Sequence, residues 1–256
     1  MGIAGAALAT GISQTIGAVV PIFYFVLKKD LIIKLGKPYF EFIPMLKGCA
    51  NGLSELFTNI SASIVSIIYN YQLMSLAGEN GIASYGVILY AQFIFLAVYF
   101  GYSMGTAPIF GFNYGANNTQ ELKNLFKKSL IVIGCSAIVL VLTSELLARP
   151  ISMIFVGYDK ILLDMTVRGF RIFAISFLIC GFNIFSSAFF TALNNGLVSL
   201  LLSIGRTFIF QILAVLLLPY YFGLDGIWLS IIMSELLALF VTIFFFILMR
   251  KRYQYY

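Results

Sequence analysis

The sequence contains no histidine among its 256 residues, and it contains only three cysteines. Histidine is the commonest general base, the usual activator of a nucleophilic serine and the commonest metal ligand. Its absence argues against most hydrolytic enzymes and against histidine-ligated metal sites. The cysteines (Cys49, Cys135 and Cys180) lie far apart in apolar runs and form neither a CxxC motif nor a disulfide framework. The residue types therefore predict that the protein is not an enzyme and carries no cofactor.

Charged residues are also scarce, at 10% of the chain, whereas hydrophobic residues make up 61%. Soluble domains carry about 25% charged and about 45–50% apolar residues. So few charges cannot cover a water-exposed surface, and the composition predicts that most of the chain faces lipid or other helices. The net charge of +6 comes from basic residues at the ends of apolar runs, which membrane topology explains better than nucleic-acid binding.

Apolar runs separated by Gly, Pro, Asn and charged residues account for nearly the whole chain. A membrane-spanning helix needs about 20 apolar residues. About seven runs have this length, at residues 3–27, 42–73, 82–112, 124–147, 161–193, 197–218 and 226–249. The predicted fold class is all-α: a polytopic membrane protein with about seven transmembrane helices. Trp228, Tyr220 and Tyr221 are predicted to belong to an interfacial aromatic belt.

The basic residues are unevenly divided between the two sides of the predicted helices. If the first helix enters from outside, twelve of the sixteen Lys and Arg residues fall on or near the cytoplasmic side and four on the outer side. An excess of Lys and Arg is typical of cytoplasmic loops. The bias predicts an outer N-terminus and a cytoplasmic C-terminus.

A short motif recurs near the two ends of the chain. The GIAG sequence at residues 2–5 corresponds to GLDG at residues 223–226, and the same offset of 221 pairs Lys29 with Arg250. Two equally oriented copies separated by six helices are typical of transporters built from parallel repeats. The repeat predicts that the first helix ends one lobe and that the next six helices form a whole lobe. A match this short also arises by chance, which is the alternative.

Several longer stretches resemble the MATE family, the multidrug and toxic compound extrusion transporters. They are GENGIASYGVILY (78–90), GYSMGTAPIFGFNYGANNTQELKNLFKKSL (101–130), SSAFFTALNNG (186–196) and GLDGIW (223–228), and the opening MGIAGAALATGIS is similar to the last helix of the family's N-lobe. The resemblance covers essentially the whole chain and is most specific at 101–130. It implies that residues 1–40 are the last N-lobe helix with the inter-lobe cytoplasmic loop, and that residues 41–256 form a six-helix C-lobe.

The resemblance also implies an activity. MATE transporters have two six-helix lobes related by a pseudo-two-fold axis along the membrane normal, and they export cationic or amphipathic compounds by alternating access, driven by Na⁺ or H⁺. The chain is accordingly expected to belong to an antiporter of the cell membrane. Its expected partners are small organic cations, the lipid bilayer and an N-lobe supplied in cis or in trans. Five N-lobe helices are expected to be missing, together with any proton-binding carboxylate of that lobe.

Glu55 is the main candidate for ion coupling. It lies near the middle of the run 42–73, and an intramembrane carboxylate is costly enough to be a functional candidate by default. At about 100° per residue, Asn51, Glu55 and Asn59 share one helix face. Carboxylate and amide oxygens can bind a hard cation such as Na⁺, and a desolvated carboxylate can exchange protons. The position resembles the C-lobe glutamate that MATE transporters use for cation coupling; a structural, paired glutamate is the alternative.

Two further helices carry polar faces that suit an organic cation. Tyr85, Gln92 and Tyr99 share a face of the run 82–112, and aromatic rings attract cations. Asn183 lies on a similar face of the run 161–193. These four residues are predicted to line a substrate cavity, with ordinary helix packing as the alternative.

Arg206 and Glu235 lie in the middle of the last two runs, which are predicted to be antiparallel neighbours. An unpaired charge inside the membrane is expensive, so the two residues are predicted to neutralise each other as a structural charge pair.

Two other functions stay open. One lobe has no partner across which to alternate, so the chain can be a non-transporting fragment or scaffold that needs a separate N-lobe. It can also be a lipid-linked sugar flippase of the same wider superfamily. Such proteins usually carry more cationic residues inside the lobe, whereas here Arg206 alone lies deep in a helix.

Overall fold

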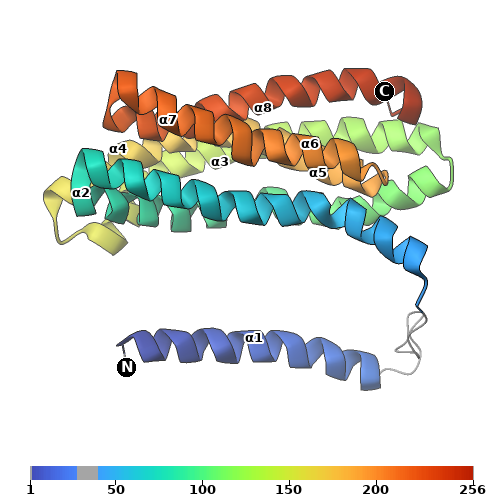
Figure 1. Ribbon diagram of the computed structural model, residues 1–256, viewed down its shortest axis with the longest axis horizontal. Helices are drawn as coiled ribbons and strands as arrows, with labels where there is room; N and C mark the ends of the chain where they lie inside the picture. Colours follow the sequence, from blue (N-terminus) through green and yellow to red (C-terminus); the bar gives the residue numbers. More distant parts are fainter. Residues whose placement is uncertain (1, 28–39, 256) are drawn as a thin grey trace. The chain divides into compact units, whose positions relative to one another are not determined.

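The computed structural model describes residues 2–27 and 40–255, apart from a few side chains in the first two helices. The chain divides into two compact units, Met1–Met45 and Leu46–Tyr256. The first unit contains α1 (Gly2–Leu27; Figure 1), an apolar helix whose described side chains are nearly all exposed. The second unit, the lobe, contains the other helices and nearly all of the buried side chains.

The lobe is helical throughout its described part. Its helices are α2 (Phe42–Gly115, of which the part from Leu46 onward belongs to the lobe), α3 (Thr119–Val156), α4 (Lys160–Ala174), α5 (Phe177–Ala192), α6 (Gly196–Ile204), the π-helical turn η1 (Gly205–Phe210), α7 (Gln211–Phe222) and α8 (Leu224–Tyr253). Helix α2 is two helices joined at Gly78, where φ is 62° and ψ is −150°. Residues other than glycine rarely adopt such a φ. The two parts of α2 run in opposite directions on either side of this break (Figure 1).

Each predicted membrane crossing corresponds to a helical segment of sufficient length. Within the described residues, five helices are long and apolar enough to cross a membrane, and α4 with α5 makes a sixth candidate as a pair bent by 52°. The break at Gly78 divides α2 into two parts, each longer than the about 20 residues that a crossing needs. These segments match the seven predicted runs. The prediction of an all-α, polytopic membrane protein is therefore confirmed.

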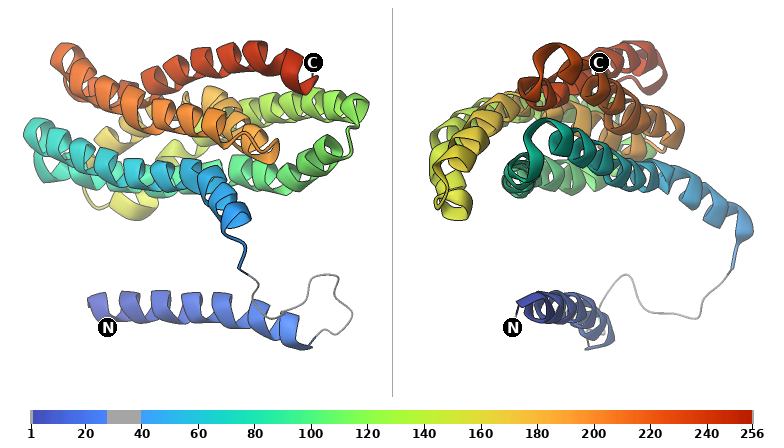
Figure 2. Two further views of the ribbon diagram at one scale, coloured as in Figure 1. Left: turned by 45° about the vertical axis from the view of Figure 1, so that its right-hand side comes forward. Right: turned by 60° about the vertical axis from the view of Figure 1, so that its left-hand side comes forward.

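Successive segments of the lobe run back and forth, so its turns gather at two ends (Figures 1 and 2). One end carries the α2–α3 turn, the α5–α6 turn and the C-terminus, and we call it the basic end. Its described charged residues are Lys47, Lys123, Lys127, Lys128, Arg250, Lys251 and Arg252, with Glu121 as the acidic one. At or near the opposite end lie Arg149, Lys160, Arg168 and Arg171 together with Glu79, Glu145, Asp159, Asp164 and Asp225.

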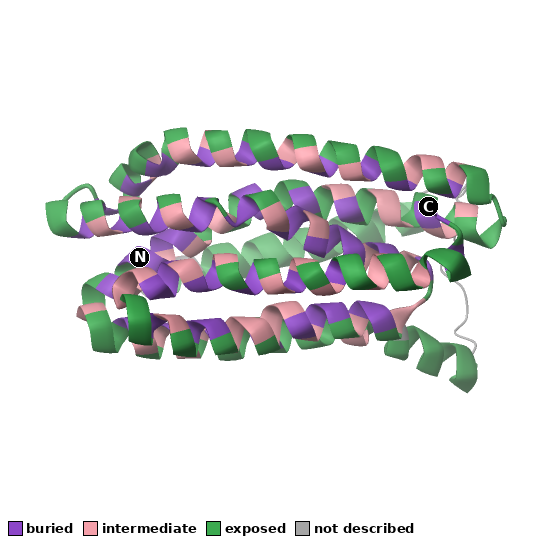
Figure 3. Ribbon diagram, turned by 90° about the horizontal axis from the view of Figure 1, so that it is seen from above, coloured by how far each residue is buried: buried purple, intermediate pink, exposed green. Residues whose placement is uncertain are grey.

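Buried side chains follow the inward faces of the helices, whereas the outward faces are exposed (Figure 3). Gly169 on α4 allows the ring of Trp228 on α8 to pack closely against it, because a Cβ atom at Gly169 would lie only 2.9 Å from that ring. Trp228 is consequently packed inside the lobe, with 1% of its surface exposed. The prediction that Trp228 belongs to an interfacial belt is wrong, because this contact with α4 holds the ring inside. Tyr220 and Tyr221 are exposed at the end of α7.

Candidate functional site

Glu55 and Asn59 lie one turn apart on the first part of α2, and both side chains are exposed on the surface of the lobe. The Asn59 Nδ2 donates a hydrogen bond to the Glu55 backbone carbonyl oxygen, 2.9 Å away. The Glu55 carboxylate forms no ion pair with any described residue. The side chain of Asn51 lies outside the described part of the structure. The predicted ion-coupling role of these three residues stays a prediction.

A cation at Glu55 would have to be bound without a cluster of carboxylates. In the described part of the chain, no three Asp, Glu, Cys or His residues are grouped so that they could hold a metal ion. One carboxylate can still contribute to a site for a monovalent cation or exchange a proton, with amide and backbone oxygens as further ligands.

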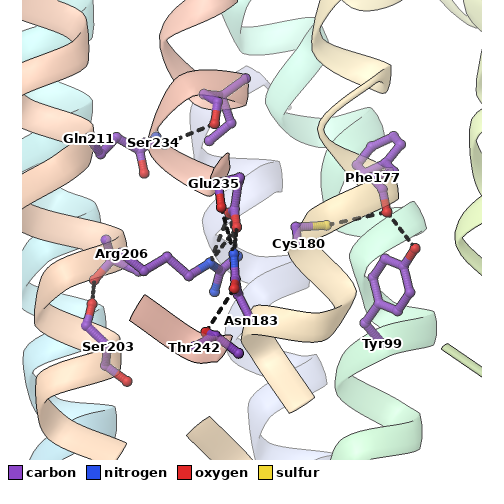
Figure 4. Close-up of polar contacts among 12 residues, drawn as sticks. Tyr99, Phe177, Cys180, Asn183, Ser203, Arg206, Gln211, Ser234, Glu235 and Thr242 are labelled. Carbon is purple, nitrogen blue, oxygen red and sulfur yellow. Dashed lines mark hydrogen bonds and ion pairs between the residues drawn. The ribbon is translucent and has the colours of Figure 1, made fainter. Parts of the chain in front are cut away.

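The tyrosines predicted to line the substrate cavity are buried inside the lobe. Tyr85 is 5% exposed and stacks on Tyr69, with ring centroids 4.9 Å apart and planes 6° from parallel. Tyr99 is 1% exposed, and its hydroxyl donates a hydrogen bond to the backbone oxygen of Phe177, 2.7 Å away (Figure 4). Gln92 is partly exposed. Both rings therefore hold helices together in this structure, and contact of either tyrosine or of Gln92 with a substrate stays a prediction.

Arg206 and Glu235 form the predicted charge pair. The Arg206 Nε donates hydrogen bonds to Glu235 Oε1 and Oε2 at 2.8 and 3.0 Å, and its Nη2 lies 2.8 Å from Oε1 (Figure 4). The side chain of Glu235 is 4% exposed and that of Arg206 16%. Arg206 lies in η1, whose wider turn is a form of helix often found at functional sites. The pair ties this turn to the middle of α8.

Asn183 joins the same network from α5. Its Nδ2 donates a hydrogen bond of 2.7 Å to Glu235 Oε2 and one of 3.0 Å to the Glu235 backbone oxygen. Its Oδ1 accepts a hydrogen bond from the Thr242 hydroxyl at 2.9 Å. With 3% of its surface exposed, Asn183 lies inside the lobe and supplies a second donor to the buried carboxylate. Its predicted place in a substrate cavity stays a prediction.

A second polar contact was not predicted from the sequence. The hydroxyls of Tyr69 and Ser230 are 2.5 Å apart, and the Gln211 Nε2 donates a hydrogen bond of 3.4 Å to the Tyr69 hydroxyl. This contact connects α2, α7 and α8. The partners of Tyr69 lie 161 and 142 residues away in the chain, so periodicity along one helix gave no signal for them.

The chain has relatives among curated proteins. The Multidrug export protein MepA of Staphylococcus aureus (strain N315) is 26% identical over 263 residues, covering 98% of this chain and 55% of the relative. MepA of Staphylococcus haemolyticus (strain JCSC1435) is 24% identical over 256 residues, with the same coverage. The chain thus spans about half the length of the curated relatives it matches. They are named as exporters, not as enzymes.

Solved structures and a family model complete the comparison. An outward-facing multidrug resistance MATE family transporter of the MOP superfamily has a TM-score of 0.88 and 21% identity, covering 99% of this chain and 57% of that one. A MATE transporter in complex with MaL6 has a TM-score of 0.85 and 22% identity, with the same coverage. At these identities the likeness establishes the fold. The MatE family model matches residues 56–217, which is more than half of the chain. The chain therefore belongs to the MatE family of multidrug and toxic compound extrusion transporters.

Proposed function

We propose that the chain is the ion-coupling lobe of a secondary active transporter that exports cationic or amphipathic compounds in exchange for Na⁺ or H⁺. The observation that carries this proposal is the exposed carboxylate of Glu55 near the middle of a membrane-crossing segment. Its support is the family membership and the export function in the names of the relatives. Because the chain spans about half of those relatives, the activity is proposed for an assembly with a second lobe, in cis or in trans.

The exposure of Glu55 supports a cavity on its face of the lobe. A carboxylate directed at lipid is expensive, and such residues almost always face a bundle interior or a water-filled space. Glu235 avoids this cost inside the lobe by pairing with Arg206. Glu55 has no such pair among the described residues and is free to bind an ion or a proton.

Coupling follows if the ion and the exported cation favour different conformations. An ion that binds Glu55 more tightly in one state moves the transporter toward that state by the difference in binding free energy. Neutralising Glu55 by Na⁺ or H⁺ also removes its attraction for an organic cation, so ion entry favours release of the compound.

The charge distribution supports a cytoplasmic basic end in the cell membrane. Of the charged residues described at that end, seven are basic and one is acidic, whereas acidic residues outnumber basic ones at the opposite end. The larger number of Lys and Arg residues at the basic end agrees with the positive-inside rule and supports a cytoplasmic C-terminus.

The test is Glu55→Gln in the transporter assembled from this lobe and its second lobe. Reconstituted in liposomes with a cationic dye inside, the wild type is expected to export the dye when a Na⁺ or a pH gradient is imposed. The gradient that works identifies the coupling ion. Glu55→Gln is expected to abolish this export at unchanged expression, and Glu79→Gln, near the opposite end of the lobe, is the matched control. Wild-type export by Glu55→Gln would reject the proposal.

One consequence of this proposal is that the lobe transports nothing until it pairs with a second lobe. The chain covers only 55% of the length of its relative, which is the reason to test the chain without a second lobe. Liposomes containing the chain alone are expected to export no dye, and addition of an N-lobe is expected to start export. The flippase alternative is disfavoured, because Glu235 already neutralises Arg206 and leaves no deep positive charge for an anionic headgroup.

A further inference from the structure

A groove lies at the basic end between the start of α3 and the end of α8. Its volume is about 250 Å³, and Leu130, Ile243 and Ile247 are among its apolar wall residues. The buried rings of Phe126 and Tyr255 also line it. We call it the basic-end groove. It shares no residue with the Glu55 face or with the Arg206–Glu235 pair.

The C-terminal tail forms part of this groove. Helix α8 ends at Tyr253; the next residue, Gln254, has a left-handed φ of 52°, and the chain then turns back toward the helix. The Tyr255 hydroxyl donates a hydrogen bond of 2.8 Å to the Phe246 backbone oxygen, and the ring lies 4.9 Å from that of Phe126. Burial raises the pKa of the Tyr255 phenol. A phenol is uncharged at neutral pH even without this shift, so the hydroxyl adds no negative charge to the groove.

The lining changes from charged to apolar along α8. Arg250 lines the groove near the end of the helix, and Ile247 and Ile243 follow one and two turns deeper. Seven residues of helix span about 10 Å. The groove therefore pairs a cationic group near the end of α8 with an apolar wall that continues along the helix away from that end.

The charge around the groove favours an anion. Arg250 lines the groove and forms no ion pair with any residue that the structure describes. Lys127 is the chain neighbour of the lining residue Phe126, and with Lys123 and Glu121 it lines an adjacent part of the α3 surface. Clusters of four to eight basic residues next to a membrane helix are typical of sites for anionic lipid headgroups. The same charges repel organic cations, so the groove does not suit the exported compounds. A free phosphate would leave its apolar wall without a partner.

We infer that the basic-end groove binds one anionic phospholipid. Its phosphate pairs with Arg250 and Lys127, and the upper part of one acyl chain lies along Ile247 and Ile243. The bound lipid holds α3 against α8 at the end where the tail folds back. This inference does not rest on ion coupling or on export, because binding is measured on the lobe itself.

The test measures lipid binding to the purified chain in a non-ionic detergent by native mass spectrometry. Phosphatidylglycerol is compared with phosphatidylcholine of the same acyl chains, and soluble glycerol phosphate is the third probe. Each basic residue near an anionic group contributes about a factor of five in affinity. The double variant Arg250→Gln/Lys127→Gln is therefore expected to bind phosphatidylglycerol about 25-fold more weakly. The matched control, Arg149→Gln/Lys160→Gln, removes two charges near the opposite end and is expected to bind as the wild type.

A second variant tests the apolar wall. Ile247→Trp fills the groove and keeps every charge, and it is expected to lose phosphatidylglycerol binding as well. Equal binding of the two lipids, unchanged phosphatidylglycerol binding in either variant, or glycerol phosphate binding as tightly as the lipid would each overturn the inference. Glu55→Gln is expected to bind phosphatidylglycerol normally, so failure of this site and failure of the transport proposal are separate results.

Discussion

Glu55 and Glu235 are both acidic residues near the middle of membrane-crossing segments, yet the structure places them in opposite surroundings. Glu235 is buried and accepts hydrogen bonds from Arg206 and Asn183. Glu55 is exposed and forms no ion pair with the described residues. A carboxylate satisfied within one lobe contributes to folding, whereas one left open on the surface is available to an ion. The two regions therefore predict different consequences for similar substitutions.

The largest effect on stability is expected for Arg206→Ala. It leaves the Glu235 carboxylate buried without its cation, which costs about 3–5 kcal/mol of the free energy of unfolding. Denaturant unfolding in detergent micelles measures this loss. The double variant Arg206→Met/Glu235→Met removes both charges at similar volume and is expected to recover most of the loss. A single variant as stable as the double one would contradict a structural role for the pair.

A smaller loss is expected for Asn183→Ala. Glu235 keeps Arg206 but loses a second donor, and an unmade hydrogen bond of a buried group costs about 1–3 kcal/mol. The matched control on the other region is Asn59→Ala, whose side chain is exposed and whose stability should change by less than about 0.5 kcal/mol. The same unfolding measurement compares them. Equal losses in the two variants would remove the distinction between the two regions.

The smallest change in stability is expected for Glu55→Gln. The side chain is exposed, so the free energy of unfolding should stay within about 0.5 kcal/mol of the wild type. The same variant is expected to lose ion-driven export, which separates function from folding. A loss of stability as large as that of Arg206→Ala would make Glu55 a structural residue.

The membrane-crossing segments followed from the sequence because each depends on local composition. A bilayer sets the length of an apolar run, and Gly78 marks a break that only glycine accommodates easily. The Arg206–Glu235 pair was also predictable, since neighbouring antiparallel helices leave two opposite charges few other partners. Glu55 was identified from the cost of a charge in lipid, without knowledge of its neighbours.

Other residues required the packing of distant segments. Tyr85 and Tyr99 are buried although they share a predicted polar face with the partly exposed Gln92, and Asn183 is buried as well. Helical periodicity groups residues on one face without telling which face turns inward. Trp228 has the composition of an interfacial residue, but Gly169 on another helix opens the space that buries it. The folded-back tail at Tyr255 depends on Phe126, which lies more than a hundred residues earlier.

The sequence by itself determined the helical class, the number of crossings, the charge bias and the position of a carboxylate within a long apolar run. These properties follow from residue type and spacing, because bilayer thickness and the cost of buried charge act on each segment separately. Only the tertiary structure decided that Asn183 joins the Arg206–Glu235 pair, which aromatic rings are buried and where a groove joins α3 to α8. Those outcomes depend on contacts between residues far apart in the chain, and close packing of several helices at once selects them.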